Sequence, residues 1–243
     1  MKKPDYGIDA PGVIRNLLLI GVVLLLIAFI LPLLWPGNIS ALLSGTAFWP
    51  GFWLALTGLV MLLYAKWGKF RHREKILSCH DWKGNEQVLD VGTGLGLLMI
   101  GAAKKLTDGS AYGIDIFNAS DLSNNNRQQL MSNASLEQVK EKICFSEQDI
   151  RKTNFDSNFF DIILSNLCLH NISGKACRRK ACMEIKRMLK PGGKAIISDF
   201  LHTGTYKKHF QELAMRVKRK GPYFWGIIPP LFIVIAEKPI IKS

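Results

Sequence analysis

The stretch Val88-Leu-Asp-Val-Gly-Thr-Gly-Leu-Gly96 decides the fold of this 243-residue chain. A short apolar run contains an acid near its end, three glycines follow at alternate positions, and the apolar segment 97–106 has the composition of a helix. Glycine permits a tight turn, and it lets backbone N–H groups and a helix N-terminus approach a ligand without interference from Cβ. The third glycine is Gly96 and position 97 is leucine, which separates this pattern from the dinucleotide fingerprint G-x-G-x-x-G.

Strand and helix signals alternate after this loop, as a doubly wound α/β sheet requires. Apolar runs predict strands at 87–91, 111–116, 143–148, 160–165 and 195–199. Helices are expected at 97–106, in the polar stretch before Lys142, from Ser173 to a stop at 189–193, and on the face marked by Tyr206, Phe210, Leu213 and Val217. The segment 223–236 is expected to form two final strands around Pro229-Pro230.

Two acids follow strands at the edge where ligands bind in such sheets. Asp115 closes the second strand, 25 residues after Asp90, where a carboxylate can accept hydrogen bonds from ribose hydroxyls. Asp149 follows the third strand, where it can accept from an adenine amino group. These positions predict a nucleoside cofactor without distinguishing nicotinamide from other nucleosides.

The glycine loop, these two acids and the segments 160–172 and 189–199 occur in an order that resembles class I S-adenosylmethionine-dependent methyltransferases. The resemblance is to the small-molecule and lipid-type branch, which has an "LKPGG" turn like that at 189–193, and it covers residues 87–199. It implies a Rossmann-like seven-stranded mixed sheet with helices on both faces and an antiparallel last strand.

The resemblance also implies S-adenosylmethionine as the cofactor. No metal site is expected from the residues. The implied cofactor contacts are Asp90, Gly92, Gly94 and Gly96 at the methionine end, Asp115 and Ile116 at the ribose, Asp149 and Ile150 at the adenine, and Asn166 after the fourth strand. For Asp90 an alternative role, capping the N–H groups of its own loop, is equally consistent with the residues.

Methyl transfer to an acceptor needs an aligned nucleophile, and it needs a base only when the acceptor is protonated. Asn166, Cys168 and His170 lie in the segment that flanks the methyl group in the family, so they are candidates for the acceptor pocket. We consider Asn166 and His170 as catalytic candidates, with His170 as a general base on pKa grounds. For His170 and Cys168 the alternative is simple packing in the loop.

Residues 16–65 contain no charged residue, and they include two apolar runs of 19 residues, 17–35 and 47–65. Each run approaches the roughly 20 residues that a membrane-spanning helix needs. Pro36-Gly37 and the segment 38–45 are expected to form the turn, so the prediction is a transmembrane helical hairpin. A signal peptide and a buried hairpin of a soluble protein explain this length less well.

Basic residues flank the hairpin and are missing from its connecting loop. The positive-inside bias therefore predicts a two-pass membrane protein with both termini and the catalytic domain in the cytoplasm. The expected domains are a cytoplasmic segment 1–15, the hairpin 16–65, a basic linker 66–84 and a methyltransferase domain 85–243.

The N-terminal segment carries aromatic, acidic and turn residues and would lie on the same side as the active site. We hypothesise that it forms a lid with Tyr6 and Asp9 near the acceptor. A loose segment at the membrane interface is the alternative.

The net charge of +13 favours an anionic lipid surface as partner over nucleic acid, because an anchor is predicted and no nucleic-acid-binding motif accompanies it. The five cysteines are expected to be free thiols. Cys177 and Cys182 lack a second pair to complete a zinc site, and their helical spacing indicates core packing.

The sequence thus predicts a membrane-anchored methyltransferase for a lipophilic or lipid-linked acceptor such as a phospholipid amine, a quinone, an isoprenoid hydroxyl or a hydrophobic thiol. A water-soluble acceptor with a purely localising anchor stays open. The alternatives are a membrane-tethered nicotinamide oxidoreductase, whose G-x-G-x-x-G and Tyr-x-x-x-Lys patterns are missing, and a non-catalytic scaffold of the same fold. An RNA methyltransferase is disfavoured because the chain has no Asn/Asp-Pro-Pro-Tyr run.

Overall fold

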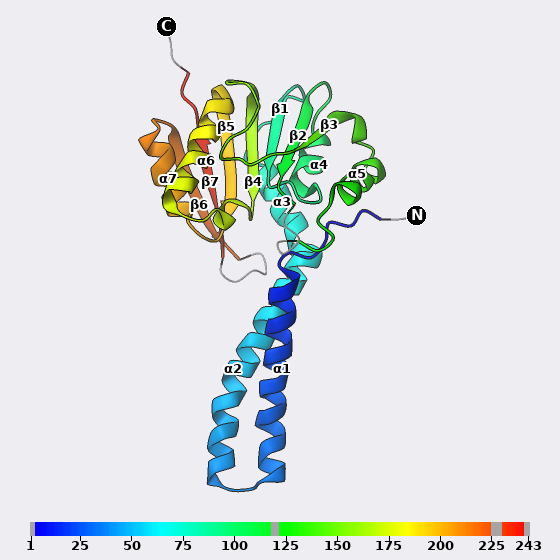
Figure 1. Ribbon diagram of the computed structural model, residues 1–243, viewed down its shortest axis with the longest axis vertical. Coiled ribbons are helices and arrows are strands. Elements are labelled where there is room, and N and C mark those ends of the chain that lie inside the picture. The colour runs from blue at the N-terminus through cyan, green and yellow to red at the C-terminus, as the bar shows by residue number, and fades with distance from the viewer. Residues whose placement is uncertain (1–2, 118–121, 225–229, 241–243) are drawn as a thin grey trace.

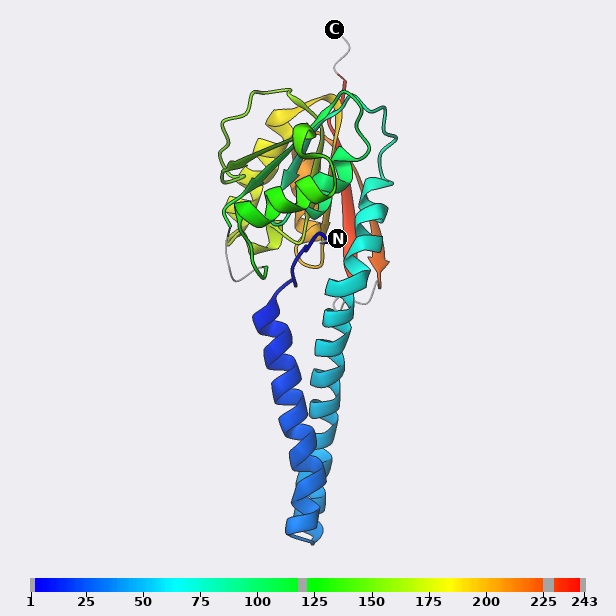
Figure 2. The same cartoon turned by 90° about the vertical axis from the view of Figure 1, so that its right-hand side faces the viewer.

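The computed structural model describes residues 3–117, 122–224 and 230–240, which form a long helical hairpin joined to an α/β domain (Figure 1). The second helix of the hairpin continues into the domain, and the N-terminal segment runs along the domain before the first helix begins (Figure 2). Both connections lie at the same end of the domain.

Seven strands form one mixed sheet in the order β3-β2-β1-β4-β5-β7-β6. Their bounds are β1 Gln87–Val91, β2 Ser110–Asp115, β3 Ile143–Glu147, β4 Phe160–Asn166, β5 Leu189–Asp199, β6 Arg216–Tyr223 and β7 Leu231–Glu237. β7 runs antiparallel to β5 and β6, whereas the pairs among β1 to β5 are parallel. This confirms the predicted sheet, and its strand order reverses between β1 and β4, where ligands bind in open α/β sheets.

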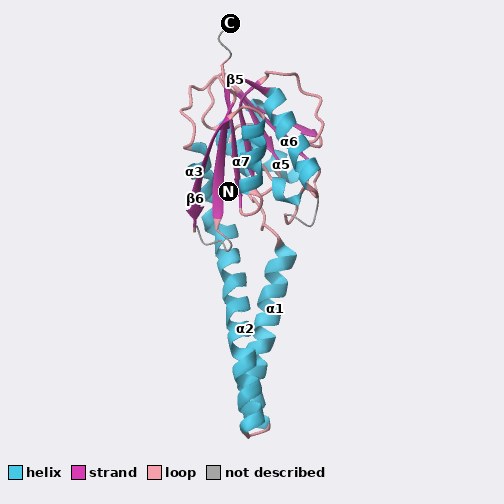
Figure 3. Ribbon diagram, turned by 90° about the vertical axis from the view of Figure 1, so that its left-hand side faces the viewer, coloured by secondary structure: helices cyan, strands magenta, loops and turns pink. Residues whose placement is uncertain are grey.

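Helices cover both faces of this sheet, as predicted (Figure 3). α3 (Lys69–Leu77), α4 (Leu97–Ala103) and α5 (Arg127–Leu136) share one buried apolar core with the sheet. α6 (Lys175–Met188) and α7 (Thr203–Glu212) form the second core on the opposite face. Short 3-10 turns lie at Lys140–Lys142 and Leu169–Asn171.

The hairpin consists of α1 (Pro11–Leu34) and α2 (Asn38–Leu63). Both helices are long and apolar enough to cross a membrane by length and composition. They pack closely through small residues, since a Cβ on Gly21 would lie 2.6 Å from the backbone nitrogen of Ala55. Much of their apolar surface is exposed, with Leu33 at 80% and Leu34 at 79%.

The connecting turn is shorter than expected, because the segment 38–45 belongs to α2 rather than to the turn. Only residues 35–37 separate the two helices. Pro36 cannot donate a backbone hydrogen bond, whereas Ala41 and the two leucines after it favour a helix.

The expected basic linker 66–84 is helical as far as Leu77. α2 passes through a π-helical turn, Tyr64–Gly68, directly into α3, which packs on α4 of the catalytic domain. Ile76 and Leu77 are fully buried there. The hairpin is therefore connected to the sheet by a continuous helical path rather than by an extended chain.

Several boundaries differ from the predictions. The segment 223–236 was expected to hold both final strands, but it holds only most of β7, because β6 is Arg216–Tyr223. The segment 189–193 begins strand β5 instead of forming a separate turn, with a register irregularity opposite Phe160 and Ile162. α4 ends at Ala103 instead of 106, and Val217 lies in β6 instead of on the last helix. The spacing of apolar residues cannot place these boundaries, because pairing with neighbouring strands decides where β5 and β6 begin. Pro229, in the expected final turn, lies outside the described residues.

Candidate active site

The loop after β1 is held in a conformation that only glycine adopts without strain at three places. Gly92, Gly94 and Gly96 have φ of +72°, +51° and +88°. The N–H groups of Gly92 and Thr93 donate to the carbonyl of Ile114 at 2.9 and 3.1 Å. The loop is thereby fixed to the end of β2, and Gly96 begins helix α4.

Asp90, near the end of β1, stabilises this loop by hydrogen bonds. Its side chain is buried, and its Oδ2 accepts hydrogen bonds from the Thr93 hydroxyl and the Met99 N–H, both at 3.0 Å. Burial raises the pKa of this carboxyl to about 7, although both hydrogen bonds oppose the shift. Asp90 thus accepts one hydroxyl of the loop and one N–H of the first turn of α4, so it connects the loop to this helix and caps no N–H group of the loop itself.

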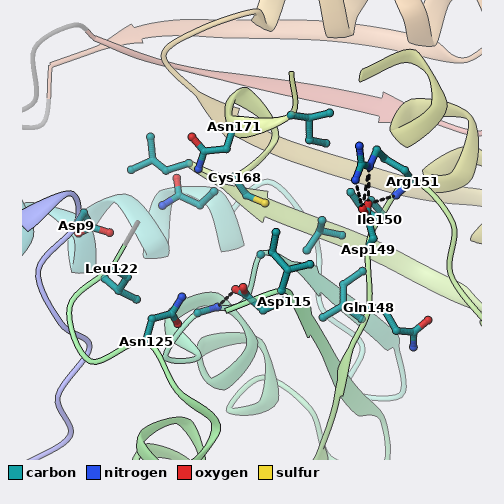
Figure 4. A pocket seen from close by; sticks show the side chains of 18 of the residues that line it. Asp9, Asp115, Leu122, Asn125, Gln148, Asp149, Ile150, Arg151, Cys168 and Asn171 are labelled. Atoms are coloured by element: carbon teal, nitrogen blue, oxygen red, sulfur yellow. Dashed lines mark hydrogen bonds and ion pairs between the residues drawn. The ribbon is translucent and has the colours of Figure 1, made fainter. Parts of the chain in front are cut away.

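A pocket of about 380 Å³ lies at the carboxyl ends of β1, β2 and β4. Its walls include most of the predicted cofactor residues: Gly92, Gly94, Asp115, Ile116, Asp149, Ile150 and Asn166. In Figure 4, Asp9 and Leu122 mark one end of this pocket, and Asp149 with Arg151 marks the other. Asp90 and Gly96 are missing from the walls of this pocket.

Asp115 connects the glycine loop to the next strand. Its Oδ2 accepts the N–H of Gly94 at 2.7 Å (Figure 4). Its Oδ1 accepts the N–H of Phe117 at 2.6 Å. The carboxylate thus orients the loop and lines the pocket at the same time. A carboxylate at this strand end is suited to ribose hydroxyls.

At the far end, Asp149 is paired with Arg151, which sequence reasoning missed. The Arg151 guanidinium donates to both carboxylate oxygens, with an Nε–Oδ2 distance of 2.8 Å. This hydrogen bonding holds the pKa of Asp149 below its usual value. The signal was available, because a basic residue two positions after an acid at a strand end can fold back on it.

The acceptor candidates are only partly brought together. Asn166 and Cys168 line the pocket, whereas His170 is not among its lining residues. His170 Nδ1 lies 2.9 Å from Oδ1 of the buried Asp199, and its ring packs against Phe200. The fold therefore favours the packing alternative for His170 over a base beside the reacting atoms.

The N-terminal segment is tightly attached to the domain, so a loose interfacial segment is wrong for residues 5–9. The N–H of Ile8 donates to Ser123 Oγ at 2.8 Å, and the N–H of Ser123 donates back to the carbonyl of Ile8 at 3.1 Å. The buried Lys69 Nζ donates to the carbonyls of Tyr6 and Gly7 at 2.7 and 2.6 Å.

The two predicted lid residues have different environments. Asp9 lines the pocket, and its Oδ2 lies 3.5 Å from the Nζ of Lys69. The Tyr6 side chain is buried against Phe70, and its hydroxyl donates to Glu137 at 3.1 Å. Tyr6 therefore fastens the segment to the domain, and Asp9 is the residue that faces the large pocket.

A smaller cavity of about 60 Å³ adjoins the pocket at the glycine loop. The two share Asp9, Gly92, Gly94, Leu122 and Asn166 in their walls. Lys69 and Asp90 line only the smaller one. Leu122, Asn125 and Asn171 also line the large pocket and carried no recognisable sequence signal, because they lie in loops or in a short 3-10 turn.

The pocket fits a nucleoside-bearing cofactor. Its volume lies in the range of small-molecule sites, roughly 300–1,000 Å³. Its glycine wall has no room for a Cβ at position 92, and an acid that can accept ribose hydroxyls stands beside it. The fit thus rests on the chemistry of the lining residues and on the shape of the glycine loop.

Comparison with known proteins agrees with this geometry. Residues 89–197 match the family described as "Methyltransferase domain". The chain is 31% identical over 163 residues to a demethylmenaquinone methyltransferase of Tropheryma whipplei, which covers 63% of this chain and 54% of that protein. It is 29% identical over 143 residues to a phosphoethanolamine N-methyltransferase of Plasmodium falciparum, and this alignment covers 58% of this chain and 48% of that protein. The chain thus spans about half the length of these curated relatives.

The solved structure of a SAM-dependent methyltransferase from Aquifex aeolicus has the same fold. It superimposes with a TM-score of 0.51 at 20% identity, over 68% of this chain and 88% of that chain. The fold, the glycine loop and the family match over residues 89–197 support a class I S-adenosylmethionine-dependent methyltransferase domain in this chain. S-adenosylmethionine is the cofactor of that class.

Proposed function

We propose that this protein is a membrane-anchored methyltransferase that works at the cytoplasmic face of a membrane on a lipophilic or lipid-linked acceptor. The observation that carries the proposal is the position of Asp9. This residue lines the cofactor pocket, and helix α1 begins only two residues later, at Pro11. The pocket therefore lies directly beside the start of the hairpin, where a membrane-dissolved acceptor would be concentrated.

Several features support the anchor and its orientation. The hairpin exposes large apolar side chains, including Leu33, Leu34 and Trp35, that water would disfavour. Lysines and arginines flank the hairpin, and the turn between its helices has none, which favours a cytoplasmic domain. The same basic residues would gain on the order of 1 kcal/mol each near anionic lipid.

S-adenosylmethionine would supply a methyl group already activated by the positive sulfonium. The loop of Gly92 and Gly94 and the Asp115 carboxylate would hold this cofactor, which would give its methyl group to a lone pair of the acceptor and leave as the neutral thioether. The protein's part is to position the two molecules and exclude water.

The residues of the chain divide this work. The loop of Gly92 and Gly94 and the carboxylate of Asp115 would hold the cofactor. Asn166 and Cys168 line the wall from which an acceptor would approach. The relatives' printed names, a demethylmenaquinone methyltransferase and a phosphoethanolamine N-methyltransferase, support acceptors of the quinone or amine type.

Calorimetric titration of the detergent-solubilised full chain with S-adenosylmethionine, and separately with NADH, tests the proposal. We expect saturable micromolar binding of S-adenosylmethionine and none of NADH. Preference for NADH would replace the proposal with an oxidoreductase. Binding of neither ligand to folded protein would leave a scaffold.

A further inference from the structure

A buried lysine and an acid from two distant segments line one small cavity at the glycine loop. Lys69 belongs to α3 and is 3% exposed, and Asp9 belongs to the N-terminal segment. Both line the cavity of about 60 Å³ that adjoins the large pocket, and Asp9 lines the pocket as well. A second acid of this cavity, Asp90, already accepts two hydrogen bonds through its Oδ2. The cavity wall therefore carries charges of both signs.

The ion pair between Lys69 and Asp9 is longer than a direct charge-assisted hydrogen bond. The Nζ of Lys69 lies 3.5 Å from the Oδ2 of Asp9, whereas such bonds are typically about 2.7–2.9 Å. The same Nζ donates to the carbonyls of Tyr6 and Gly7 at 2.7 and 2.6 Å. An ammonium group has three N–H donors, so these two carbonyls leave one donor for the more distant Asp9 carboxylate.

The position of Asp9 along the pocket indicates which part of a cofactor it would meet. Asp9 lies at the end of the pocket opposite Asp149, and Asp115 lies between them (Figure 4). With the ribose expected at Asp115 and the adenine at Asp149, the amino-acid end of S-adenosylmethionine would face Asp9 and the small cavity. That end carries an α-ammonium and an α-carboxylate group, which are the charges that a carboxylate and a lysine bind.

We propose that Asp9 binds the α-ammonium group and Lys69 the α-carboxylate group of the cofactor's amino-acid end. This inference rests on the proposed function and deepens it, because it assigns two further residues to cofactor binding. Asp9 and Lys69 thereby exchange one long ion pair for two direct ones.

Both residues lie outside the matched family domain, residues 89–197, and next to the hairpin. Asp9 comes two positions before the first residue of α1, and Lys69 follows the π-helical turn after α2. Each of the two chain segments that join the hairpin to the domain therefore supplies one binding residue. The backbone of Asp9 forms an antiparallel bridge with Leu122, so its side chain can be changed without releasing the segment.

The test is calorimetric titration of the detergent-solubilised full chain with three adenosine ligands. S-adenosylmethionine carries both charged groups, decarboxylated S-adenosylmethionine keeps the amine alone, and methylthioadenosine has neither. The variants are Asp9→Asn and Lys69→Met. Asp108→Asn and Lys66→Met are the matched controls, because both of these residues are exposed.

We expect Asp9→Asn to weaken binding of the two amine-bearing ligands about tenfold and that of methylthioadenosine less than twofold. In Lys69→Met, the affinity for S-adenosylmethionine relative to its decarboxylated form should fall about tenfold. This ratio isolates the carboxylate contact, because a loosened N-terminal segment would weaken both ligands alike. The controls should change neither quantity.

Two results would overturn the inference. One is an equal effect of Asp9→Asn on all three ligands, and the other is an unchanged affinity ratio in Lys69→Met. Absence of S-adenosylmethionine binding to the folded wild-type protein would instead refute the proposed function.

Discussion

Gly92 and Cys168 face each other so closely that a Cβ at position 92 would lie 2.3 Å from the Sγ of Cys168 and 2.5 Å from its Cβ. The loop after β1 and the loop after β4 therefore touch at the base of the cofactor pocket. A larger residue at position 92 would displace Cys168. Glycine is therefore needed here for its small size as well as for its positive φ.

A steric test follows from this contact. Gly92→Ala should weaken S-adenosylmethionine binding at least about tenfold, because the loop must shift away from Cys168. Adding Cys168→Gly should restore part of the affinity, whereas Cys168→Ala should not, because its Cβ would remain in the way. Calorimetry on the three variants measures this. An equal loss in both double variants would mean that the strain of a non-glycine residue at φ +72° dominates.

Asp115 should contribute to cofactor affinity through its carboxylate. Asp115→Ala removes the acceptor of the Gly94 N–H and the expected partner of the ribose, so we expect S-adenosylmethionine to bind about 10- to 100-fold more weakly. Asp108→Ala, an exposed acid on the turn before β2, is the matched control. An unchanged dissociation constant in Asp115→Ala would contradict the assigned cofactor orientation.

The buried Asp90 predicts a pH dependence of stability. Its folded-state pKa of about 7 lies above its usual value of 3.8, so between these values the folded protein binds more protons than the unfolded chain. Stability should therefore fall as the pH rises through this window and level off above it. The melting temperature of the cofactor-free protein in detergent should decrease between about pH 5 and 8.

Asp90→Asn keeps an acceptor for the Thr93 hydroxyl and the Met99 N–H but cannot ionise. Its melting temperature should depend less on pH than that of the wild-type protein. A cation bound nearby favours the ionised carboxylate, so S-adenosylmethionine should also bind the wild-type protein more tightly at about pH 8 than at pH 6. Identical pH profiles in the variant would assign the dependence to other groups.

Lys69 should hold the N-terminal segment on the domain. Lys69→Met removes its bonds to the carbonyls of Tyr6 and Gly7 and its contact with Asp9. We expect faster amide hydrogen exchange in residues 6–9 and weaker cofactor binding. The matched control is Lys66→Met, because Lys66 is exposed in the π-helical turn. Exchange that stays slow in Lys69→Met would show that the Tyr6 and Ser123 contacts suffice.

Cys144 provides a native reporter of membrane orientation. It is an exposed thiol on β3, whereas Cys182 is buried. A membrane-impermeant maleimide should label Cys144 in inverted membrane vesicles and leave it unlabelled in intact cells. Cys144→Ser is the control for specificity. Labelling of Cys144 in intact cells would place the domain on the opposite side.

The sequence predicted β1 and β4 because these strands are largely apolar, whereas β6 was missed because its residues are mostly basic and polar. β1 was predicted at 87–91 and observed there. Predictions failed where the local composition favours neither a helix nor a strand. The segment 66–84 reads as a basic linker, yet burial of Ile76 and Leu77 against α4 makes most of it a helix.

Sequence alone determined the loop, the positions of Asp115 and Asp149, and the apolar hairpin, because each depends on residue type at a fixed spacing. Only the tertiary structure decided that Asp9 reaches the cofactor pocket, that His170 pairs with Asp199, and that Tyr64 and His72 both contact Asn166. The residues in these contacts are at least 29 positions apart in the sequence, and they meet only when the strands and helices pack together. The spacing of residues within one segment carries no information about which distant segment it will contact.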